Sequence, residues 1–288
     1  MPITDRIDPD LLKDIPNLPM EKQREILSLL EELENAESKE VARDSYLSFI
    51  KRVWPAFIEG SHHKIMAKAF ERVANGELKR LIINMPPRHT KSEFASYLLP
   101  AWFLGRFPEK KIIQTAHTAE LSVGFGRKVR NLVDSDDFKE LFPRVALRAD
   151  SKAAGRWSTN EGGEYFAIGV GGAVTGKGAD LLIIDDPHSE QEGQSADPSV
   201  FDKVYDWYTS GPRQRLQPGG AIIVVMTRWH KRDLTGQIIK SSVQRKGTDE
   251  WEVIEFPAIL PSGNALWPQF WPKEELEALR NELPAPKW

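Results

Sequence analysis

The sequence predicts an α/β fold with a mainly parallel central sheet flanked by helices. Five short segments dense in Ile, Leu and Val predict strands, at residues 78–84, 110–116, 164–170, 180–186 and 221–227. Nearly continuous apolar runs of this kind are typical of strands buried on both faces, as in a parallel sheet. Helical patterns lie between them, for example at residues 93–107 and 119–135, so that strands and helices alternate along the chain.

The first 43 residues precede this pattern and form a predicted N-terminal arm and amphipathic helix. Four prolines fall within residues 1–19, which predicts a loosely held arm. Ile26, Leu30 and Leu33 then follow at helical spacing within residues 20–36. We expect this helix to pack on the flank of the domain rather than to serve as a dedicated partner-binding helix. The α/β domain is predicted at residues 44–260, and residues 261–288 read as a proline-punctuated linker with one short helix.

Composition limits the classes of function. The chain has 288 residues, of which 40% are hydrophobic and 28% charged, as in ordinary globular proteins. Its formal net charge is −3, so any contact with nucleic acid would come from a local basic patch. The absence of cysteine excludes disulfides, thiol nucleophiles and thiolate zinc sites. No apolar run approaches the length of about eighteen residues that a membrane span needs, so we expect no membrane partner.

The segment that agrees best with the consensus of a phosphate-binding loop is GGAVTGKGAD, which contains G-x-x-x-x-G-K. A working phosphate loop leaves a strand and enters a helix, whose free N–H groups hold the phosphates. This glycine-rich loop (residues 171–178) instead joins two predicted strands, and Gly178 stands where Ser or Thr should supply a hydroxyl to Mg²⁺. We therefore predict that it is not the phosphate site.

A second segment, MPPRHTKS, lies between a predicted strand and a predicted helix, as a phosphate loop should, but its residues depart from the consensus motif. This proline loop (residues 85–92) follows a predicted strand, ends in Lys91-Ser92 and opens directly into a helical pattern. Met85 and Thr90 stand where the motif has glycines, so a positive φ at Thr90 would be strained. Taken alone, Lys91-Ser92 could equally be an exposed lysine followed by a helix-capping serine.

Carboxylates and a Thr-Arg pair follow two other buried strands. DLLIIDDP ends in Asp185-Asp186, and AIIVVMTRWH carries Thr227-Arg228 at the end of its apolar run. The carboxyl ends of strands in open α/β sheets are where ligands bind. One carboxylate there can hold Mg²⁺ through water and the other can orient the water that attacks a γ-phosphate. Each could alternatively be a turn residue before Pro187.

Together, MPPRHTKSE, TGKGADLLIIDDP and VVMTRWH, in this order and spacing, resemble the large subunit of tailed-phage terminase, the ATP-driven DNA-packaging motor. The resemblance runs from about residue 45 to the C-terminus. It implies a P-loop NTPase fold of the ASCE (RecA-like) type for the N-terminal domain, with ATP and Mg²⁺ as cofactors. PPRH-x-KS would be the divergent Walker A motif.

The resemblance also implies roles for single residues. Lys91 would contact the β- and γ-phosphates, Ser92 and Asp185 would hold Mg²⁺, and Asp186 would be the catalytic carboxylate. Thr227 and Arg228 would match the motif that couples hydrolysis to movement. Because the catalytic carboxylate is often Glu in this family, Glu93 or Glu190 could assist Asp186. The implied nucleotide-binding residues are Pro87, Arg88, His89, Thr90, Lys91, Ser92 and Glu93.

Two further elements of the site stay open. Arg88 could reach the γ-phosphate as an arginine finger, or it could be a surface arginine paired with a carboxylate. A finger from a neighbouring subunit is the alternative, with Arg127, Arg130, Arg144 and Arg148 as unranked candidates. The segment RVWPAFIEGSHHKIM resembles the adenine side of the family, where Trp54 and His63 would contact the base. Tryptophan at such a position is more often part of the core.

The resemblance implies double-stranded DNA, a portal protein and the terminase small subunit as partners, self-association into a ring on the portal, and the host cell cytoplasm as location. Family members normally continue into a nuclease domain, whereas this sequence stops at LPAPKW, so we expect no nuclease activity from this chain. Two other functions remain possible at this stage. One is a helicase-like ATPase that remodels nucleic acid, and the other is an inactive structural module that binds a partner through the helix at residues 20–36.

Overall fold

The computed structural model describes residues 15–195, 197–245, 247 and 249–283. Its strands are β1 (Arg80–Asn84), β2 (Lys111–Ala116), β3 (Leu147–Ala153), β4 (Arg156–Thr159), β5 (Glu164–Gly169), β6 (Ala179–Asp185), β7 (Leu216–Met226) and β8 (Glu252–Glu255). Its helices are η2 (Ile15–Asn17), α2 (Met20–Asp44), α3 (Tyr46–Val53), α4 (Ser61–Ala74), η3 (Glu93–Leu98), α5 (Leu99–Arg106), α6 (Ala119–Val133), α7 (Asp136–Leu141), α8 (Glu190–Gly193), α9 (Ser199–Ser210), η4 (Pro212–Arg215), α10 (Leu234–Gln244) and α11 (Lys273–Glu282).

All eight strands belong to one sheet in the order β3-β4-β5-β2-β6-β7-β1-β8. The pairs from β5 to β8 are parallel, while β4 pairs with both β3 and β5 in antiparallel fashion. The prediction of a mainly parallel α/β fold is therefore confirmed. One feature of the order matters for the site: β7 lies between β6, which carries Asp185, and β1, which leads into the proline loop.

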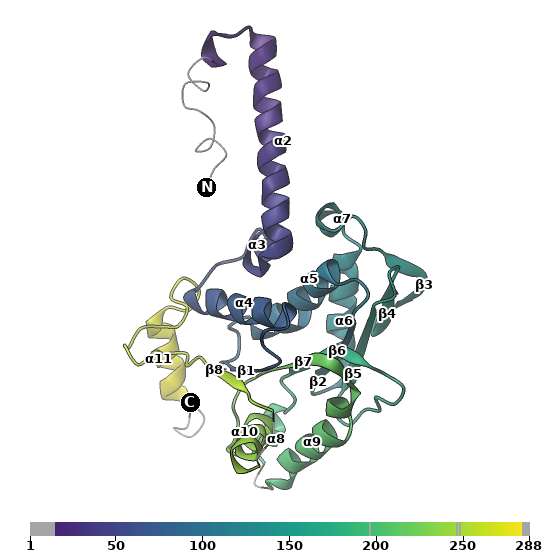
Figure 1. Ribbon diagram of the computed structural model, residues 1–288. Helices are drawn as coiled ribbons and strands as arrows, with labels where there is room; N and C mark the ends of the chain where they lie inside the picture. Colours follow the sequence, from purple (N-terminus) through teal and green to yellow (C-terminus); the bar gives the residue numbers. More distant parts are fainter. Residues whose placement is uncertain (1–14, 196, 246, 248, 284–288) are drawn as a thin grey trace.

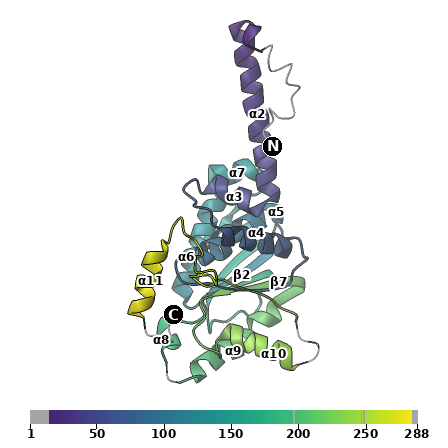
Figure 2. The same cartoon turned by 90° about the vertical axis from the view of Figure 1, so that its left-hand side faces the viewer.

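Helices cover both faces of the sheet, with α3 to α7 on one side and α8 to α10 on the other (Figures 1 and 2). Side chains alternate across β7, because Ile223 and Val225 belong to the core under α3, α4 and α5, whereas Ile222 and Val224 face the core under α9 and α10. Each central strand is thus buried on both sides, which explains its unbroken run of apolar residues.

The sequence located the five central strands and missed those at the edges. β3 and β4 form an antiparallel pair at one edge, and β8 closes the other. Their sequences, LRADSKA, RWST and EVIE, hold few consecutive apolar residues, because an edge strand with one solvated face needs fewer. Because these segments are short and polar, runs of apolar residues did not identify them as strands.

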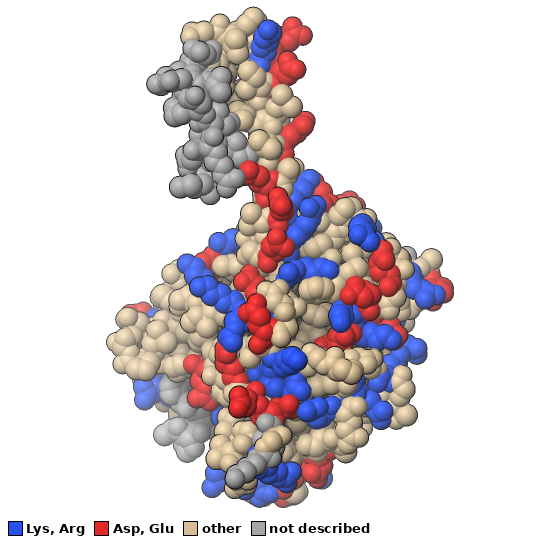
Figure 3. Space-filling model, in the orientation of Figure 1, with Lys and Arg blue, Asp and Glu red and all other residues tan. Residues whose placement is uncertain are grey.

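The N-terminal helix α2 is longer than predicted and stands away from the body (Figures 1 and 2). Only Ala42 of this helix is fully buried, and Leu33 of the predicted stripe is half exposed. The expectation that the stripe packs on the flank of the domain is wrong, because only the last turns reach the body. Acidic side chains follow α2 on the face shown in Figure 3, whereas charges of both signs intersperse over the body. The arm predicted at residues 1–14 lies outside the described residues.

The segment after residue 260 contains the predicted short helix, α11, and also contacts the body. Leu266 and Trp267 are buried, and the Leu266 N–H donates to the Ala258 carbonyl at 2.9 Å. The domain boundary at residue 260 stays a prediction, but Ala265, Leu266 and Trp267 are buried, and Leu266 belongs to the same hydrophobic core as the strands. Among the described residues, no helix is both long enough and apolar enough to span a bilayer.

Candidate functional site

The carboxyl ends of β6, β7 and β1 meet at one edge of the sheet because the three strands are adjacent and parallel. Backbone hydrogen bonds continue just past the strand ends. The Asp186 N–H donates to the Val225 carbonyl at 2.9 Å, and the Met85 N–H donates to the Met226 carbonyl at 3.1 Å. The residues that follow each strand therefore lie within contact distance, although they are far apart in the sequence.

Lys91 is the centre of this edge. Its Nζ lies 2.8 Å from Asp186 Oδ2 and 3.2 Å from Thr227 Oγ1, and its side chain is only 7% exposed. Asp186 Oδ1 accepts a hydrogen bond from the Thr227 N–H at 2.8 Å, and the Thr227 hydroxyl donates to the Met85 carbonyl at 3.3 Å. Lysine, carboxylate and threonine, each from a different strand end, thus form one connected polar cluster.

Ser92 and Asp185 form a second contact beside the first. The Ser92 hydroxyl donates to Asp185 Oδ1 at 2.9 Å, and the Ser96 hydroxyl donates to Oδ2 at 2.7 Å. Ser96 lies one helical turn after Ser92 and itself accepts from Gln114 Nε2 at 2.9 Å. The buried carboxylate is therefore fixed from both sides, because each of its oxygens accepts a hydroxyl hydrogen bond.

The electrostatic state of Asp185 suits a site that receives a cation. Burial and then the negative charge of Asp186 raise the pKa of Asp185 to about 7, against the lowering effects of its serine hydrogen bonds and of Lys91. A carboxylate and a hydroxyl are the hard oxygen ligands that Mg²⁺ accepts. Among the described residues no group of three His, Asp or Glu side chains could hold a metal alone. Mg²⁺ commonly uses one or two protein oxygens together with phosphate oxygens, so the pair Ser92 and Asp185 fits it.

The backbone around this cluster is strained. Arg88, Thr90 and Asp186 have φ values of 62°, 68° and 39°, a region that residues other than glycine rarely adopt. Such conformations cost of the order of 1–3 kcal/mol each and persist only where surrounding contacts hold them, most often at functional sites. The strain foreseen at Thr90, where a standard phosphate loop has glycine, is therefore present.

His63 supplies one of the contacts that hold Thr90. The Gly60 N–H donates to His63 Nδ1 at 2.7 Å, so the ring proton is on Nε2, which donates to Thr90 Oγ1 at 2.7 Å. The Thr90 hydroxyl in turn donates to the His89 carbonyl at 2.5 Å. Burial, and secondarily the nearby His62 and His89, lower the pKa of His63 to about 2, so its ring stays neutral.

The His63 ring does not offer a face to a ligand. It is fully buried, stacks on Phe94 at a centroid distance of 4.8 Å, and meets Trp267 edge-on at 5.0 Å. The predicted contact with adenine therefore differs from the arrangement found, in which His63 reaches the proline loop only through Thr90. Trp54, the other residue predicted there, is half-buried and packs its ring 5.4 Å from Phe57.

Two more imidazoles complete a buried group under the proline loop. Neither ring nitrogen of His62 has a hydrogen-bond partner among the described residues, and burial followed by the charge of His89 lowers the pKa of His62 to about 4. His89 Nδ1 donates to the Pro87 carbonyl at 2.8 Å, and burial lowers its pKa as well. The ring of Trp271 stacks on His89 at 6.2 Å, while its Nε1 donates to the Arg88 carbonyl at 3.3 Å. The loop thus rests on neutral rings.

The arginines occupy different surroundings. Arg88 is exposed, and its guanidinium has no ion-pair partner among the described residues, so the alternative of a surface arginine paired with a carboxylate is not what the structure contains. Arg228 contacts two carboxylates: its Nε lies 2.9 Å from Asp233 Oδ2, and its NH1 lies 3.4 Å from Glu255 Oε1. The sequence places Arg228 next to Thr227, which belongs to the cluster around Lys91. In the structure the Arg228 side chain instead binds the buried carboxylate of Asp233.

Other predicted residues lie at the rim. Pro87 is exposed, and Glu93 is half-buried at the start of η3, a π-helical turn. Glu93 and Glu190 stay predicted as carboxylates that could assist Asp186. The π-helical turn fits the sequence, because Pro100 lacks the N–H that an α-helix would need to bond to the Ser96 carbonyl.

Sequence reasoning missed Ser96, Gln114 and Asp233. Two of them left a signal. Ser96 follows Ser92 by four residues and so shares its helix face, and Gln114 is a polar interruption in the apolar strand KIIQTA. Both are completely buried and are joined by the hydrogen bond from Gln114 Nε2 to the Ser96 hydroxyl at 2.9 Å. Asp233 resembles an ordinary helix cap in sequence, and only the structure reveals that it also binds Arg228.

The glycine-rich loop lies elsewhere. It joins β5 directly to β6, as predicted, and Lys177 Nζ lies 3.3 Å from Glu164 at the beginning of β5. Because β5 and β6 both run parallel to β2, the beginning of β5 and the end of β6 are at opposite edges of the sheet. Lys177 and Asp185 are therefore separated by the length of the strands. This loop contributes nothing to the cluster around Lys91.

Comparison with known proteins gives a likeness in fold. No protein-family model matches the sequence, and no curated protein matches it. Among solved structures, the chain is similar to the large terminase of bacteriophage HK97, at a TM-score of 0.49 and 16% identity over 76% of this chain and 44% of that one. A mutant of the large-terminase ATPase domain of a Thermus phage matches at a TM-score of 0.50 and 14% identity, over 82% and 93% of the two chains. A second structure of that Thermus phage domain gives 0.43 and 15%, over 75% and 88%. The match at 0.50 indicates that this chain has the fold of a terminase ATPase domain.

Proposed function

We propose that this chain binds and hydrolyses ATP with Mg²⁺ and is the motor domain of a terminase large subunit, which moves double-stranded DNA into a procapsid. The observation that carries the proposal is the convergence of Lys91, Asp186, Ser92 and Asp185 at one edge of a parallel sheet. The shared fold supports it. A lysine and a serine hydroxyl at a strand-to-helix junction, facing two carboxylates, are the parts that phosphoryl transfer from a nucleotide needs.

The proposed roles follow from the contacts. Lys91 holds the β- and γ-phosphates, and Ser92 with Asp185 holds the metal ion. A Mg²⁺ ion held there would supply the positive charge that offsets the negative charge on the transferring phosphoryl group. Asp186 orients the attacking water, since its Oδ1 is already fixed by the Thr227 N–H. The guanidinium of Arg88 is exposed and has no ion-pair partner among the described residues, so it can reach a γ-phosphate.

The contact between Lys91 and Asp186 suggests how the site responds to its substrate. Phosphate groups beside Lys91 compete with Asp186 for the ammonium group, so binding weakens an ion pair that measures 2.8 Å in this structure. Asp186 and Lys91 both bond to Thr227, which begins the segment leading to Arg228. Thr227 is therefore the residue that transmits the change, in agreement with its proposed coupling role.

The partners are proposed with the same function. They are double-stranded DNA, a portal protein, the terminase small subunit and further copies of this chain in a ring on the portal, within the host cell cytoplasm. The layer of tryptophan and imidazole rings under the proline loop, including His63, supports the nucleotide site from behind rather than contacting adenine. Pro87, His89, Thr90 and Glu93 belong to the proposed loop that surrounds the phosphates.

ATP turnover with Mg²⁺ tests the proposal. We expect measurable hydrolysis by the wild-type chain and a loss of about a hundredfold or more in Asp185→Asn, which keeps the shape of the side chain and removes its charge. Ser92→Ala should raise the Mg²⁺ concentration needed for half-maximal turnover. Wild-type rates retained in both variants would contradict the metal site. A folded chain that fails to bind ATP in calorimetry would favour an inactive structural module.

A further inference from the structure

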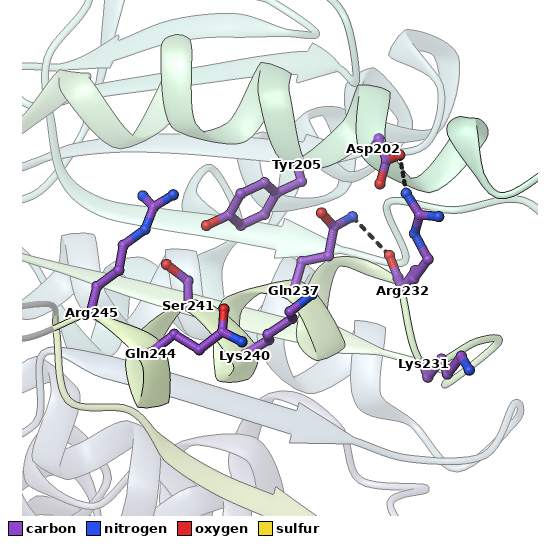
Figure 4. Close-up of a pocket in the computed structure, with 9 residues that line it drawn as sticks. All are labelled: Asp202, Tyr205, Lys231, Arg232, Gln237, Lys240, Ser241, Gln244 and Arg245. Carbon is purple, nitrogen blue, oxygen red and sulfur yellow. Dashed lines mark hydrogen bonds and ion pairs between the residues drawn. The ribbon is translucent and has the colours of Figure 1, made fainter.

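A groove with a volume of about 490 Å³ lies between α9 and α10, on the face of the sheet opposite α4 (Figure 4). Both helices follow strands of the parallel sheet and return along it, so they run side by side in the same direction. One end of the groove is closed by the ion pair of Arg232 with Asp202 and by Gln237, whose Nε2 donates to the Arg232 carbonyl at 2.8 Å. The proposed nucleotide site does not include this groove.

The residues that line the groove carry an excess of positive charge, although the formal net charge of the chain is −3. Lys231, Arg232, Lys240 and Arg245 line it, whereas Asp202 is the one carboxylate among its described lining residues and is already paired with Arg232. Lys231 and Lys240 are exposed and make no ion pair within the described part of the chain. Cations that face one cavity without partners concentrate positive potential there. The groove therefore favours an anionic ligand.

One face of α10 supplies the hydrogen-bond donors. Gln237, Lys240, Ser241 and Gln244 recur at the spacing of a single helix face, and all of them line the groove. The opposite face, with Ile238, is buried against the sheet. The Gln237 amide already donates to the Arg232 and Phe201 carbonyls, at 2.8 and 3.1 Å, so the available donors are Lys240, Ser241 and Gln244. They extend over about 6 Å at 1.5 Å per residue. A strand of duplex DNA carries one phosphate per about 3.4 Å of axis, so the row matches about two successive phosphates.

α10 is also tied to the candidate phosphate site. The Asp233 carboxylate caps α10 by accepting from the Gly236 N–H at 2.9 Å, and it also accepts from the Trp229 and His230 N–H groups at 3.1 and 3.2 Å. Arg228 Nε donates to the same carboxylate at 2.9 Å. Asp233 is completely buried, so its carboxylate joins the segment after β7 to the start of α10 inside the domain. Because Arg228 follows Thr227, a shift of Thr227 moves the start of α10 and one wall of the groove.

We propose that the groove between α9 and α10 binds the phosphate backbone of double-stranded DNA, and that α10 shifts its grip as the nucleotide site changes state. This inference rests on the proposed function and names the surface of the motor that holds its substrate. Recognition is through charge and hydrogen-bond donors, without contacts that distinguish bases. The basic helix α6 is a poorer candidate, because Lys128 Nζ already lies over the rings of Phe125 and Tyr97, at 5.6 and 5.9 Å.

The test is binding of the whole chain to a short fluorescent DNA duplex over a series of salt concentrations. We expect Lys231→Ala/Lys240→Ala to weaken binding at low salt by about an order of magnitude, and to reduce the slope of log affinity against log salt by about 0.9 for each lysine removed. Lys68→Ala is the matched control, because Lys68 is an exposed lysine on α4, on the other face of the sheet, and forms no ion pair with any residue that the structure describes. It should bind DNA like the wild type. Thermal melting of each variant establishes that it is folded.

The outcomes separate this inference from the proposed function. If the wild type binds the duplex and the double variant binds it with the same affinity and slope, the groove is not the DNA site, and the proposed function stands. If the wild type does not bind the duplex at low salt, both the groove assignment and the DNA part of the proposed function are overturned. Displacement of the duplex by polyglutamate as readily as by unlabelled DNA would overturn the assignment to nucleic acid and point to an acidic protein.

Discussion

Two loops of this chain carry a lysine that a phosphate-binding loop could use. They differ in their match to the consensus motif, in the elements that flank them and in the contacts of the lysine. The glycine-rich loop contains the consensus G-x-x-x-x-G-K and joins two strands. Its Lys177 Nζ pairs with Glu164 and lies 5.2 Å from the centroid of the Phe166 ring. The proline loop lacks the glycines, yet it leaves a strand, enters a helix and buries Lys91 against Asp186. The two lysines lie at opposite edges of the sheet.

The difference teaches that position in the sheet decides what a lysine can bind. Helices that start at the carboxyl edge direct free N–H groups and partial positive charge toward a ligand, and the neighbouring strands bring their carboxylates to the same edge. Glycine lowers the conformational cost of a phosphate loop, but other contacts can hold the same backbone. Here Thr90 has a φ of 68° and is held by His63, whereas Gly176 has a φ of 74° and needs no such support.

The largest expected effect comes from exchanging the two lysines for alanine. Lys91→Ala should lower ATP turnover by about 10²–10³-fold, because it removes the cation that stabilises the transferring phosphoryl group. Lys177→Ala should leave turnover within about twofold of the wild type, since its contacts are to Glu164 and Phe166. Steady-state hydrolysis of both variants measures the contrast. A loss in Lys177→Ala with none in Lys91→Ala would reverse the assignment of the loops.

A second effect tests whether His63 substitutes for glycine in the proline loop. His63→Phe keeps an aromatic ring beside Phe94 but loses the hydrogen bond to Thr90, so ATP affinity should fall by about five- to tenfold, the worth of one hydrogen bond. In a Thr90→Gly background the loop no longer needs that bond, and the same substitution should change ATP affinity by less than about twofold. Calorimetric titration of the four chains gives the comparison.

His62→Phe is the control, because His62 is equally buried and, within the described part of the chain, its ring forms no hydrogen bond with Thr90. It should alter stability and leave affinity for ATP unchanged. Equal losses of affinity from His63→Phe in the wild-type chain and in the Thr90→Gly background would mean that His63 acts only through general packing.

A third difference between the loops concerns how the surroundings of each loop make the stability of the chain depend on pH. The proline loop rests on histidines that burial keeps neutral, with pKa values of about 4 for His62 and about 2 for His63, whereas an unfolded histidine titrates near 6.5. The unfolded chain therefore binds more protons, and the free energy of unfolding should fall as pH drops below about 6.5, by up to about 1.4 kcal/mol per pH unit for each histidine. For His62 this loss continues down to about pH 4.

Urea unfolding at pH 7 and pH 5 measures this dependence. His62→Phe should reduce the change in unfolding free energy between the two pH values, because one of the titrating groups is gone. An unchanged pH dependence in that variant would show that His62 is not held neutral in the folded chain.

The smallest expected effect lies in the glycine-rich loop itself. Gly176→Ala places a side chain in open space, since no atom lies within 4 Å of the added Cβ, but it forces alanine to a φ of 74°. This should cost about 1 kcal/mol and lower the melting temperature by about 2–4 °C, with ATP turnover unchanged. Thermal melts and turnover assays check both halves. A large loss of turnover would return this loop to the phosphate site.

The sequence was sufficient for the central strands and for the meeting of Lys91, Ser92, Asp185, Asp186 and Thr227, whose roles remain predictions. Parallel strands must end at one edge, so residues that follow buried apolar runs must lie near one another. Sequence was not sufficient at β3, β4 and β8, because edge strands need few apolar residues. It also failed for α2, where an apolar stripe predicted packing and only Ala42 is buried.

Side-chain direction explains the remaining differences at the site. Arg228 follows Thr227 and was predicted to help couple hydrolysis to movement, and its guanidinium binds the completely buried Asp233, which needs a cation. His63 was predicted at adenine from its place in the chain, yet α4 directs it inward under Thr90. In both cases a partner distant in sequence or hidden in the core decides the direction, and no local pattern records that partner.

The central claim is that the proline loop holds the phosphates. A crystal structure of the chain with a non-hydrolysable ATP analogue and Mg²⁺ tests it most directly. We expect the β- and γ-phosphates beside Lys91, the metal ion bound by Ser92 with Asp185 beside it, and the contact between Lys91 and Asp186 lengthened from 2.8 Å. Phosphates bound at Lys177 in the glycine-rich loop, or within the groove between α9 and α10 and not at Lys91, would contradict the claim.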